Sequence, residues 1–426
     1  MILSLFAAGL LLLDQGPARN AAEASGASSK EEQDLEKALS EAGSSPVDYS
    51  RALERHLKRY PKSERRGEYE RVLAQAAIDL KDKRRILLYG IPAIEGGSRS
   101  GQLLDHVTRA LLEKDDRASN ELALKYARLL VEVVEGQRAA LTGARKFEPL
   151  RGRRLDEIEY ALARARTFEA RALDNLGRYD GAAAAAAQGW EACPTEENAR
   201  ERARIYERAG QAGEALGAFA EALALAGDRT TAADAGRDRQ RLAALAKQAT
   251  GAESGFGEAL LAAFARVEQA QAERRKRLKA MDPNFEARQP LEFTLSGTQG
   301  DRLEMASLRG KVVVIDFWAT WCGPCRAQHP LYEQVKQRFK DNKDVVFLAV
   351  STDEDRGVVA PFLKAQQWSP QAYYEDGMAA ALRINSIPTA VVLDREGNIV
   401  SRMNGYIADR FVEMLSERIR ESLEEK

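Results

Sequence analysis

Apolar and polar positions follow two different periods along the chain. Up to about residue 280, apolar side chains recur every three or four positions, as in residues 119–135, where Leu122, Tyr126 and Val133 share one helical face. Residues 311–317 instead form a continuous apolar, β-branched run that predicts a buried strand, and helical spacing returns over residues 326–339. We therefore expect a multidomain protein in which an all-α domain precedes an α/β domain.

Residues 36–280 have the composition of a helical domain, rich in Ala, Leu, Glu, Arg and Lys with few β-branched runs. Some of its residues repeat at a separation of 33 positions: Gly177 with Gly210, Ala182 with Ala215, and Ala186 with Phe219. This spacing resembles the second half of a tetratricopeptide unit. We expect a tetratricopeptide-like (TPR-like) helical-repeat domain, with a generic helical bundle as the alternative.

The most informative segment is Trp321-Cys322-Gly323-Pro324-Cys325, which places two thiols between the end of the predicted strand and the start of a helix. At a helix N-terminus the first sulfur meets unpaired backbone N–H groups and the positive end of the helix dipole, which favour a thiolate. The segment therefore predicts a dithiol that attacks disulfides.

A metal site is the main competing interpretation of two cysteines at this spacing. Zinc needs further ligands, and the other candidates, Cys193, His56 and His106, lie far upstream in a chain with three cysteines and three histidines. Copper bound by the soft thiolates and a purely structural disulfide are further alternatives. We predict no metal and no cofactor.

Two motifs carry a resemblance to a known family. Residues 316–325 resemble the active-site segment of the thioredoxin fold, and residues 310–326 are similar to the TlpA-like thiol-disulfide oxidoreductases of the redoxin group. Ile387-Pro388-Thr389, ahead of an apolar run, resembles the family's cis-proline loop. The resemblance covers about residues 283–424 and implies an α/β thioredoxin-like domain over residues 291–426.

The resemblance also implies roles for individual residues. Cys322 corresponds to the exposed nucleophile and Cys325 to the buried resolving thiol. The substrate-binding residues implied are Trp321, which packs beside the first sulfur, Gly323, Pro324, Ile387, Pro388 and Thr389. In the family, the proline loop faces the dithiol and offers backbone groups to the substrate.

Asp316 stands six residues before Cys322, where thioredoxin-like proteins carry a buried carboxylate. Burial should raise its pKa, so that it accepts the proton of Cys325 as that thiol attacks the mixed disulfide. The alternative is a strand aspartate that faces solvent. The chain also departs from thioredoxins, which place a lysine on the next strand, because it reads only apolar residues at positions 347–350.

The function expected from these residues is thiol-disulfide exchange, with the protein acting as a reductant of protein disulfides. The Gly-Pro pair between the cysteines favours a potential nearer thioredoxin's roughly −270 mV than the roughly −120 mV of strong oxidants. Two alternatives remain: a TPR-type binding module with an accessory redoxin domain, and a thiol peroxidase. The peroxidase pattern lacks its threonine and proline, since Ala319 and Ile315 occupy those positions.

The first thirteen residues are largely apolar, too few for a membrane span of about 20 residues but suited to a signal-peptide core. Ala22-Glu23-Ala24 fits a cleavage site. We expect residues 1–24 to be a signal peptide or N-terminal anchor and residues 25–35 a disordered leader. The protein would then be exported, to the bacterial periplasm or on a membrane anchor facing it, with electrons from a membrane thiol donor.

The net charge of −1 over 426 residues gives no reason to expect nucleic-acid binding. The expected partners are protein disulfide substrates and a protein docked on the helical repeats. Residues 281–290, which include a helix-breaking proline, predict a linker. Two other side chains receive structural interpretations: Cys193 as a small buried hydrophobe and His329 as a solvent-facing helical residue.

Overall fold

The computed structural model describes residues 30–43, 45–114, 116–143, 150–226, 232–252, 255–405 and 408–424. The chain divides into two compact units, Met1–Arg138 with Ile158–Gln271 and Ala139–Glu157 with Ala272–Lys426. The expected signal peptide or anchor at residues 1–24 lies outside the described residues. Within the described ranges, each helix is too short or too polar to cross a bilayer.

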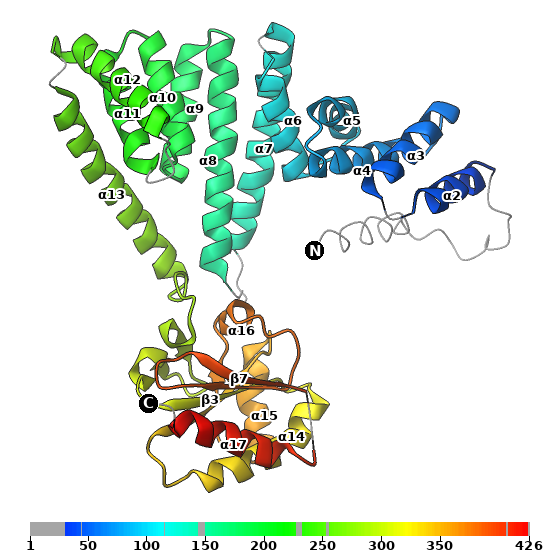
Figure 1. The fold of residues 1–426 in the computed structure, drawn as a ribbon, viewed down its shortest axis with the longest axis vertical. Helices are drawn as coiled ribbons and strands as arrows, with labels where there is room; N and C mark the ends of the chain where they lie inside the picture. Colours follow the sequence, from blue (N-terminus) through cyan, green and yellow to red (C-terminus); the bar gives the residue numbers. More distant parts are fainter. Residues whose placement is uncertain are drawn as a thin grey trace. The chain divides into compact units, whose positions relative to one another are not determined.

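The first unit is built from helices, as the sequence predicts (Figure 1). They are α2 (Lys30–Ala42), α3 (Pro46–Arg59), α4 (Arg66–Asp79), α5 (Lys83–Glu95), α6 (Gly101–Leu112), α7 (Arg117–Gly143), α8 (Arg151–Asn175), α9 (Tyr179–Ala192), α10 (Glu196–Arg208), α11 (Ala212–Ala226), α12 (Ala232–Thr250) and α13 (Phe256–Met281). Residues 30–35 belong to α2, so the helical region begins earlier than expected, within the proposed leader. Fully buried alanines line its main core, which lets helices approach closely.

Two turns in this unit share one backbone geometry. Gly177, between α8 and α9, and Gly210, between α10 and α11, have φ angles of +75° and +72°. In each turn the following residue closes the preceding helix: Arg178 N–H donates to the carbonyl of Leu173 at 2.8 Å, and Gln211 N–H donates to that of Tyr206 at 2.8 Å. The repeat of 33 residues therefore coincides with a repeated turn, while its assignment as a tetratricopeptide stays a prediction.

The second unit contains a five-stranded mixed sheet in the order β5-β4-β3-β6-β7, and a short hairpin. The sheet strands are β3 (Val312–Trp318), β4 (Val345–Ser351), β5 (Tyr373–Tyr374), β6 (Thr389–Leu393) and β7 (Ile399–Asn404), and the hairpin joins β1 (Thr294–Ser296) to β2 (Arg302–Glu304). The helices are α14 (Gly323–Arg338), α15 (Val359–Gln366), α16 (Met378–Ala381) and α17 (Phe411–Glu424), with 3₁₀ turns η3 (Pro290–Glu292), η4 (Met305–Leu308) and η5 (Arg356–Val358). The expected thioredoxin-like α/β domain is confirmed.

Strand β3 is the centre of this unit and is buried along its whole length. It pairs in parallel with β4 and antiparallel with β6. Val312 and Val314 pack with side chains of α14 and α17 on one face, while Val313, Ile315 and Phe317 pack with the η3, η4 and α16 segments on the other. A strand covered on both faces reads as the uninterrupted apolar run seen in the sequence.

The segment expected to be a linker is packed rather than loose. Asn284 is 4% exposed, donates to the carbonyls of Thr294 and Asp376 at 2.9 and 3.0 Å, and accepts from Thr294 N–H at 2.8 Å. Residues 139–157 belong to the same unit, and within it Gly152 N–H donates to Asp282 Oδ2 at 3.0 Å. The predicted linker at residues 281–290 therefore lies inside the second unit.

The positive φ of Gly210 yields a prediction about stability. Gly210→Ala should destabilise the helical unit by about 1–2 kcal/mol, because an L side chain is strained in the left-handed region. Gly136→Ala is the matched control: Gly136 lies inside α7, and a methyl group added there would meet open space, so alanine should stabilise by up to about 1 kcal/mol. Urea unfolding followed by far-UV circular dichroism measures both. Stabilisation by Gly210→Ala would contradict the turn geometry.

Candidate active site

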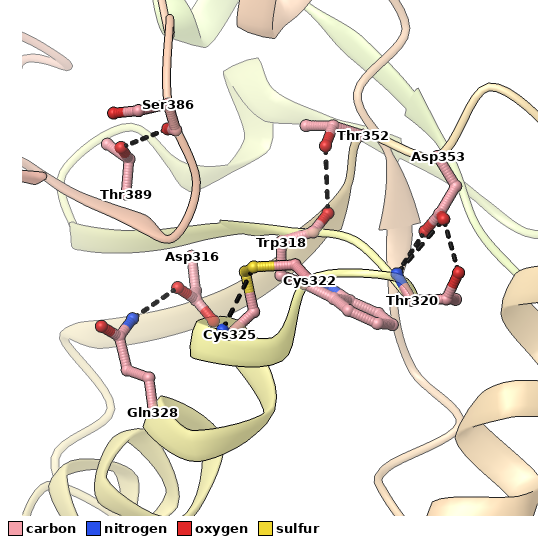
Figure 2. The surroundings of a disulfide bond; sticks show 10 residues. All are labelled: Asp316, Trp318, Thr320, Cys322, Cys325, Gln328, Thr352, Asp353, Ser386 and Thr389. Atoms are coloured by element: carbon pink, nitrogen blue, oxygen red, sulfur yellow. Dashed lines mark hydrogen bonds between the residues drawn. A yellow bond between two sulfur atoms is a disulfide. The ribbon is translucent and has the colours of Figure 1, made fainter. Parts of the chain in front are cut away.

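The two cysteines lie at the junction of β3 and α14, as the sequence predicts. Cys322 and Cys325 form a disulfide with Cα atoms 5.3 Å apart. Cys322 is the N-cap of α14, and its Sγ accepts the backbone N–H of Cys325 at 3.1 Å (Figure 2). Pro324 occupies the first turn of the helix, where its missing N–H costs no hydrogen bond. The helix therefore presents a donor to the sulfur expected to be the nucleophile.

The expectation that Cys322 is exposed is wrong for this disulfide state. Cys322 and Cys325 are each 4% exposed, and both belong to an apolar cluster with Trp318, Val359 and Ile387. Residues from distant parts of the sequence cover the sulfurs, which the local motif does not reveal. Trp321 also differs from expectation: it is 70% exposed and stands outside this cluster, which contains Trp318 instead.

Asp316 is buried on β3, and the alternative of a solvent-facing aspartate is excluded. The residue is 6% exposed, and burial raises the pKa of its carboxyl to about 7. In the register of β3 and β4, Asp316 lies opposite Ala349, which fits the absence of a lysine there. Asp316 can therefore exchange a proton near neutral pH, as a general base for Cys325 requires.

The partner of Asp316 is Gln328, which sequence reasoning missed. Its side-chain Nε2 donates to Asp316 Oδ1 at 3.2 Å, and the residue is 1% exposed. Gln328 stands three residues after Cys325, so both face the same side of α14. The spacing from Cys325 could have indicated that Gln328 faces the site. Its hydrogen bond to Asp316, however, depends on how α14 packs on β3, which the sequence does not show.

A cavity of about 360 Å³ lies beside the dithiol, and Asp316 and Cys325 both contribute to its lining. His329 and Trp368 line it too, and their rings stack with centroids 3.5 Å apart. Burial lowers the pKa of His329, which favours the neutral imidazole. The solvent-facing placement expected for His329 is therefore wrong, because Trp368 covers the ring.

The loop at residues 386–389 has the features expected from the resemblance. The Ile387–Pro388 peptide bond is cis, and Ile387 packs against the cluster that holds both cysteines. Thr389 begins β6 opposite Phe317 of β3, and its hydroxyl donates to the carbonyl of Ser386 at 2.7 Å (Figure 2). Trp321, Gly323 and Pro324 are exposed next to the disulfide. Their role in substrate binding, and that of the loop, stays a prediction.

The third cysteine belongs to the other of the two units. Cys193 is buried in the alanine-rich core of the helical unit and takes no part in the disulfide. This matches its interpretation as a small core residue.

A dithiol at the start of α14, a buried carboxyl and a cis-proline loop on a five-stranded mixed sheet define a thioredoxin-like redox domain. Residues 310–399 match the family described as thioredoxin-like. The thiol-disulfide oxidoreductase ResA of Bacillus subtilis is 30% identical over 122 residues, which are 28% of this chain and 68% of ResA. A ResA of Bacillus cereus is 27% identical over 115 residues, 26% of this chain and 66% of that protein.

Among solved structures, a thiol:disulfide interchange protein of the thioredoxin family from Chlorobium tepidum is 25% identical, with a TM-score of 0.28. The match covers 31% of this chain and 92% of that one. The chain spans about two thirds of the length of the ResA proteins it matches. It belongs to the thioredoxin-like thiol-disulfide oxidoreductases.

The raised pKa of Asp316 predicts a pH-dependent stability cost. An unfolded aspartate ionises near pH 3.8, whereas the folded one ionises at about 7. Below both values the carboxyl is protonated in both states and costs nothing; between them only the unfolded state loses its proton, so stability falls as pH rises. Asp316→Asn does not titrate and should gain stability over the parent by up to roughly 4 kcal/mol by pH 8.

Urea unfolding of the oxidised proteins at pH 4, 6 and 8 measures this difference. The exposed Asp341→Asn is the control and should follow the parent at every pH. A difference between Asp316→Asn and the parent that stays constant from pH 4 to pH 8 would contradict the raised pKa.

Proposed function

We propose that the protein reduces protein disulfides through Cys322 and Cys325. The observation that carries this proposal is the placement of Cys322 Sγ on the N-terminus of α14, with the Cys325 N–H directed at it. A thiolate is stabilised there relative to a thiol in water. The buried carboxyl of Asp316 shares a cavity with Cys325, which supplies the second requirement, a proton acceptor for the resolving thiol.

The reaction then has two steps. The Cys322 thiolate attacks one sulfur of a substrate disulfide, which forms a mixed disulfide and releases the other substrate sulfur as a thiolate. Cys325 transfers its proton to Asp316 and attacks Cys322 Sγ, which forms the Cys322–Cys325 disulfide and releases the second substrate thiolate. Two electrons pass to the substrate, and an external dithiol must return them before the next cycle.

The direction and location of the reaction are the finer parts of the proposal. The Gly323-Pro324 pair supports a reductant with a potential near that of thioredoxin, roughly −270 mV. The apolar start of the chain supports export and, with it, a membrane thiol carrier as the electron donor.

Insulin reduction tests the reductant proposal. The reduced protein should reduce insulin, Cys322→Ser should not, and Cys325→Ser should stop after one covalent capture because no thiol is left to release the substrate. Asp316→Asn should leave the first capture near the parent rate but slow release by roughly tenfold or more, since the general base is lost. Rapid-quench analysis separates the two steps. No insulin turnover by the reduced parent would favour the binding-module alternative.

The helical unit is proposed to dock the proteins that the dithiol reduces. Helix α13 leaves Leu261 and Phe264, three residues apart on one helical face, 73% and 51% exposed, and contiguous exposed apolar patches are typical of surfaces that bind other proteins. A docking surface on the same chain raises the local concentration of substrate without altering the chemistry at sulfur.

Substitutions on α13 test this docking better than a deletion of the helical region, because residues 139–157 belong to the unit that carries the sheet. In the Cys325→Ser chain, Leu261→Ser with Phe264→Ser should reduce the yield of trapped protein partners severalfold, while a small disulfide still reacts at the parent rate. Leu88→Ser, at another exposed leucine, is the control. An unchanged yield of trapped partners would reject docking on α13.

A further inference from the structure

The segment that leads from β3 to the nucleophile is bonded to the segment that follows β4. Thr320, two residues before Cys322, donates its backbone N–H to Asp353 Oδ2 at 3.0 Å and its hydroxyl to Oδ1 at 2.6 Å. The neighbouring Thr352 N–H donates to the carbonyl of Trp318 at 2.8 Å. Figure 2 shows the surroundings of the disulfide in which these bonds lie. The turn before Cys322 is therefore stabilised by hydrogen bonds to a residue more than thirty positions away in the sequence.

Asp353 is itself fixed and buried. The residue is 7% exposed, its Oδ2 accepts the Ser351 hydroxyl at 2.9 Å, and its N–H donates to that same oxygen of Ser351 at 3.1 Å. In the described part of the chain, the recorded donors to its carboxylate are neutral groups of Thr320 and Ser351. A buried carboxylate without a cation is costly unless several donors satisfy it. The hydrogen bonds to Thr320 and Ser351 therefore offset the cost of burying the Asp353 carboxylate.

We propose that Asp353 is a positioning residue for the nucleophile. It fixes Thr320 and through it the turn in which Cys322 N–H donates to the carbonyl of Ala319 at 3.1 Å. This turn sets where Cys322 Sγ meets the Cys325 N–H at the start of α14. The inference rests on the proposed function in one respect, since it assigns Asp353 to the activation of the same Cys322 thiolate.

Asp353 affects the ionisation of Cys322 in two opposite ways, through its charge and through its hydrogen bonds to Thr320. A nearby negative charge disfavours a thiolate, so its removal would make Cys322 ionise at lower pH. Loss of the hydrogen bonds to Thr320 would instead allow the turn to adopt other conformations, and the Cys322 thiolate would then lack the hydrogen bond from Cys325 N–H for part of the time. The sign of the change therefore separates positioning from a simple charge effect.

The experiment follows the alkylation of Cys322 against pH in the full-length Cys325→Ser chain, read by mass spectrometry of the peptide that contains Cys322. Asp353→Ala should raise the pH midpoint of alkylation by about half to one unit, which is the loss of about one net hydrogen bond to the thiolate. At pH 7 the alkylation rate should fall by about three- to tenfold. Thr320→Val keeps the backbone N–H and loses only the hydroxyl, so its shift should have the same sign and be smaller.

Asp353→Asn is the rescue variant. With its amide oxygen in the place of Oδ2 it can accept the Thr320 N–H and the Ser351 hydroxyl, and its NH₂ in the place of Oδ1 can donate to the Thr320 hydroxyl oxygen, so the hydrogen bonds to Thr320 are kept and the charge is removed. Its alkylation midpoint should not rise: it should equal that of the parent or lie slightly below it, because only the charge is lost. Asp394→Ala is the matched control, because Asp394 fixes a different turn by accepting N–H groups of Glu396 and Asn398 at 3.0 and 2.8 Å. It should leave the midpoint unchanged.

Three results would overturn the proposal: equal downward shifts for Asp353→Ala and Asp353→Asn, no shift in Asp353→Ala, or the same upward shift in Asp394→Ala. Alkylation needs no protein substrate, so these outcomes are independent of insulin turnover. A parent that fails to reduce insulin while Asp353→Ala still shifts the midpoint would reject the proposed function and leave the positioning role intact.

Discussion

The hydrogen bond from Cys325 N–H to Cys322 Sγ is the interaction on which the site depends. It forms only if a strand ends one turn before a helix begins, with the first cysteine as the N-cap. Strand β3 meets this requirement because it is fixed between β4 and β6 and buried on both faces. The large apolar core of the sheet therefore serves a local purpose, since it holds the end of β3 where the dipole of α14 acts on one sulfur.

Two buried aspartates flank this bond and differ in what surrounds them. Asp316 has one amide donor, from Gln328, and its pKa rises to about 7 because burial outweighs that single bond. Asp353 accepts from a backbone N–H and two hydroxyls. A carboxyl with few donors is suited to exchanging protons, and one with several donors is suited to holding a structure in place. The two aspartates of this site are therefore suited to different roles: Asp316 to exchanging a proton and Asp353 to fixing the turn at Thr320.

Neighbouring side chains decide how accessible the dithiol is. Val359 and Ile387 come from segments on either side of β5, yet both pack in the cluster that covers the disulfide. The exposed groups beside it are Trp321 and the first turn of α14.

The sequence by itself determined the features that depend on near neighbours: the buried strand, the cysteine pair at the start of a helix, the proline loop before β6, and the helical character of the first unit. The strand, the cysteine pair and the helical character follow from periodicity or spacing within a few residues, whereas the proline loop is implied by the resemblance to a known family. Tertiary structure decided the burial of Cys322 and the stacking of Trp368 on His329. It also decided two hydrogen bonds, from Gln328 to Asp316 and from Thr320 to Asp353. The physical reason is that these contacts depend on strand register and helix packing, which bring together residues far apart in the chain.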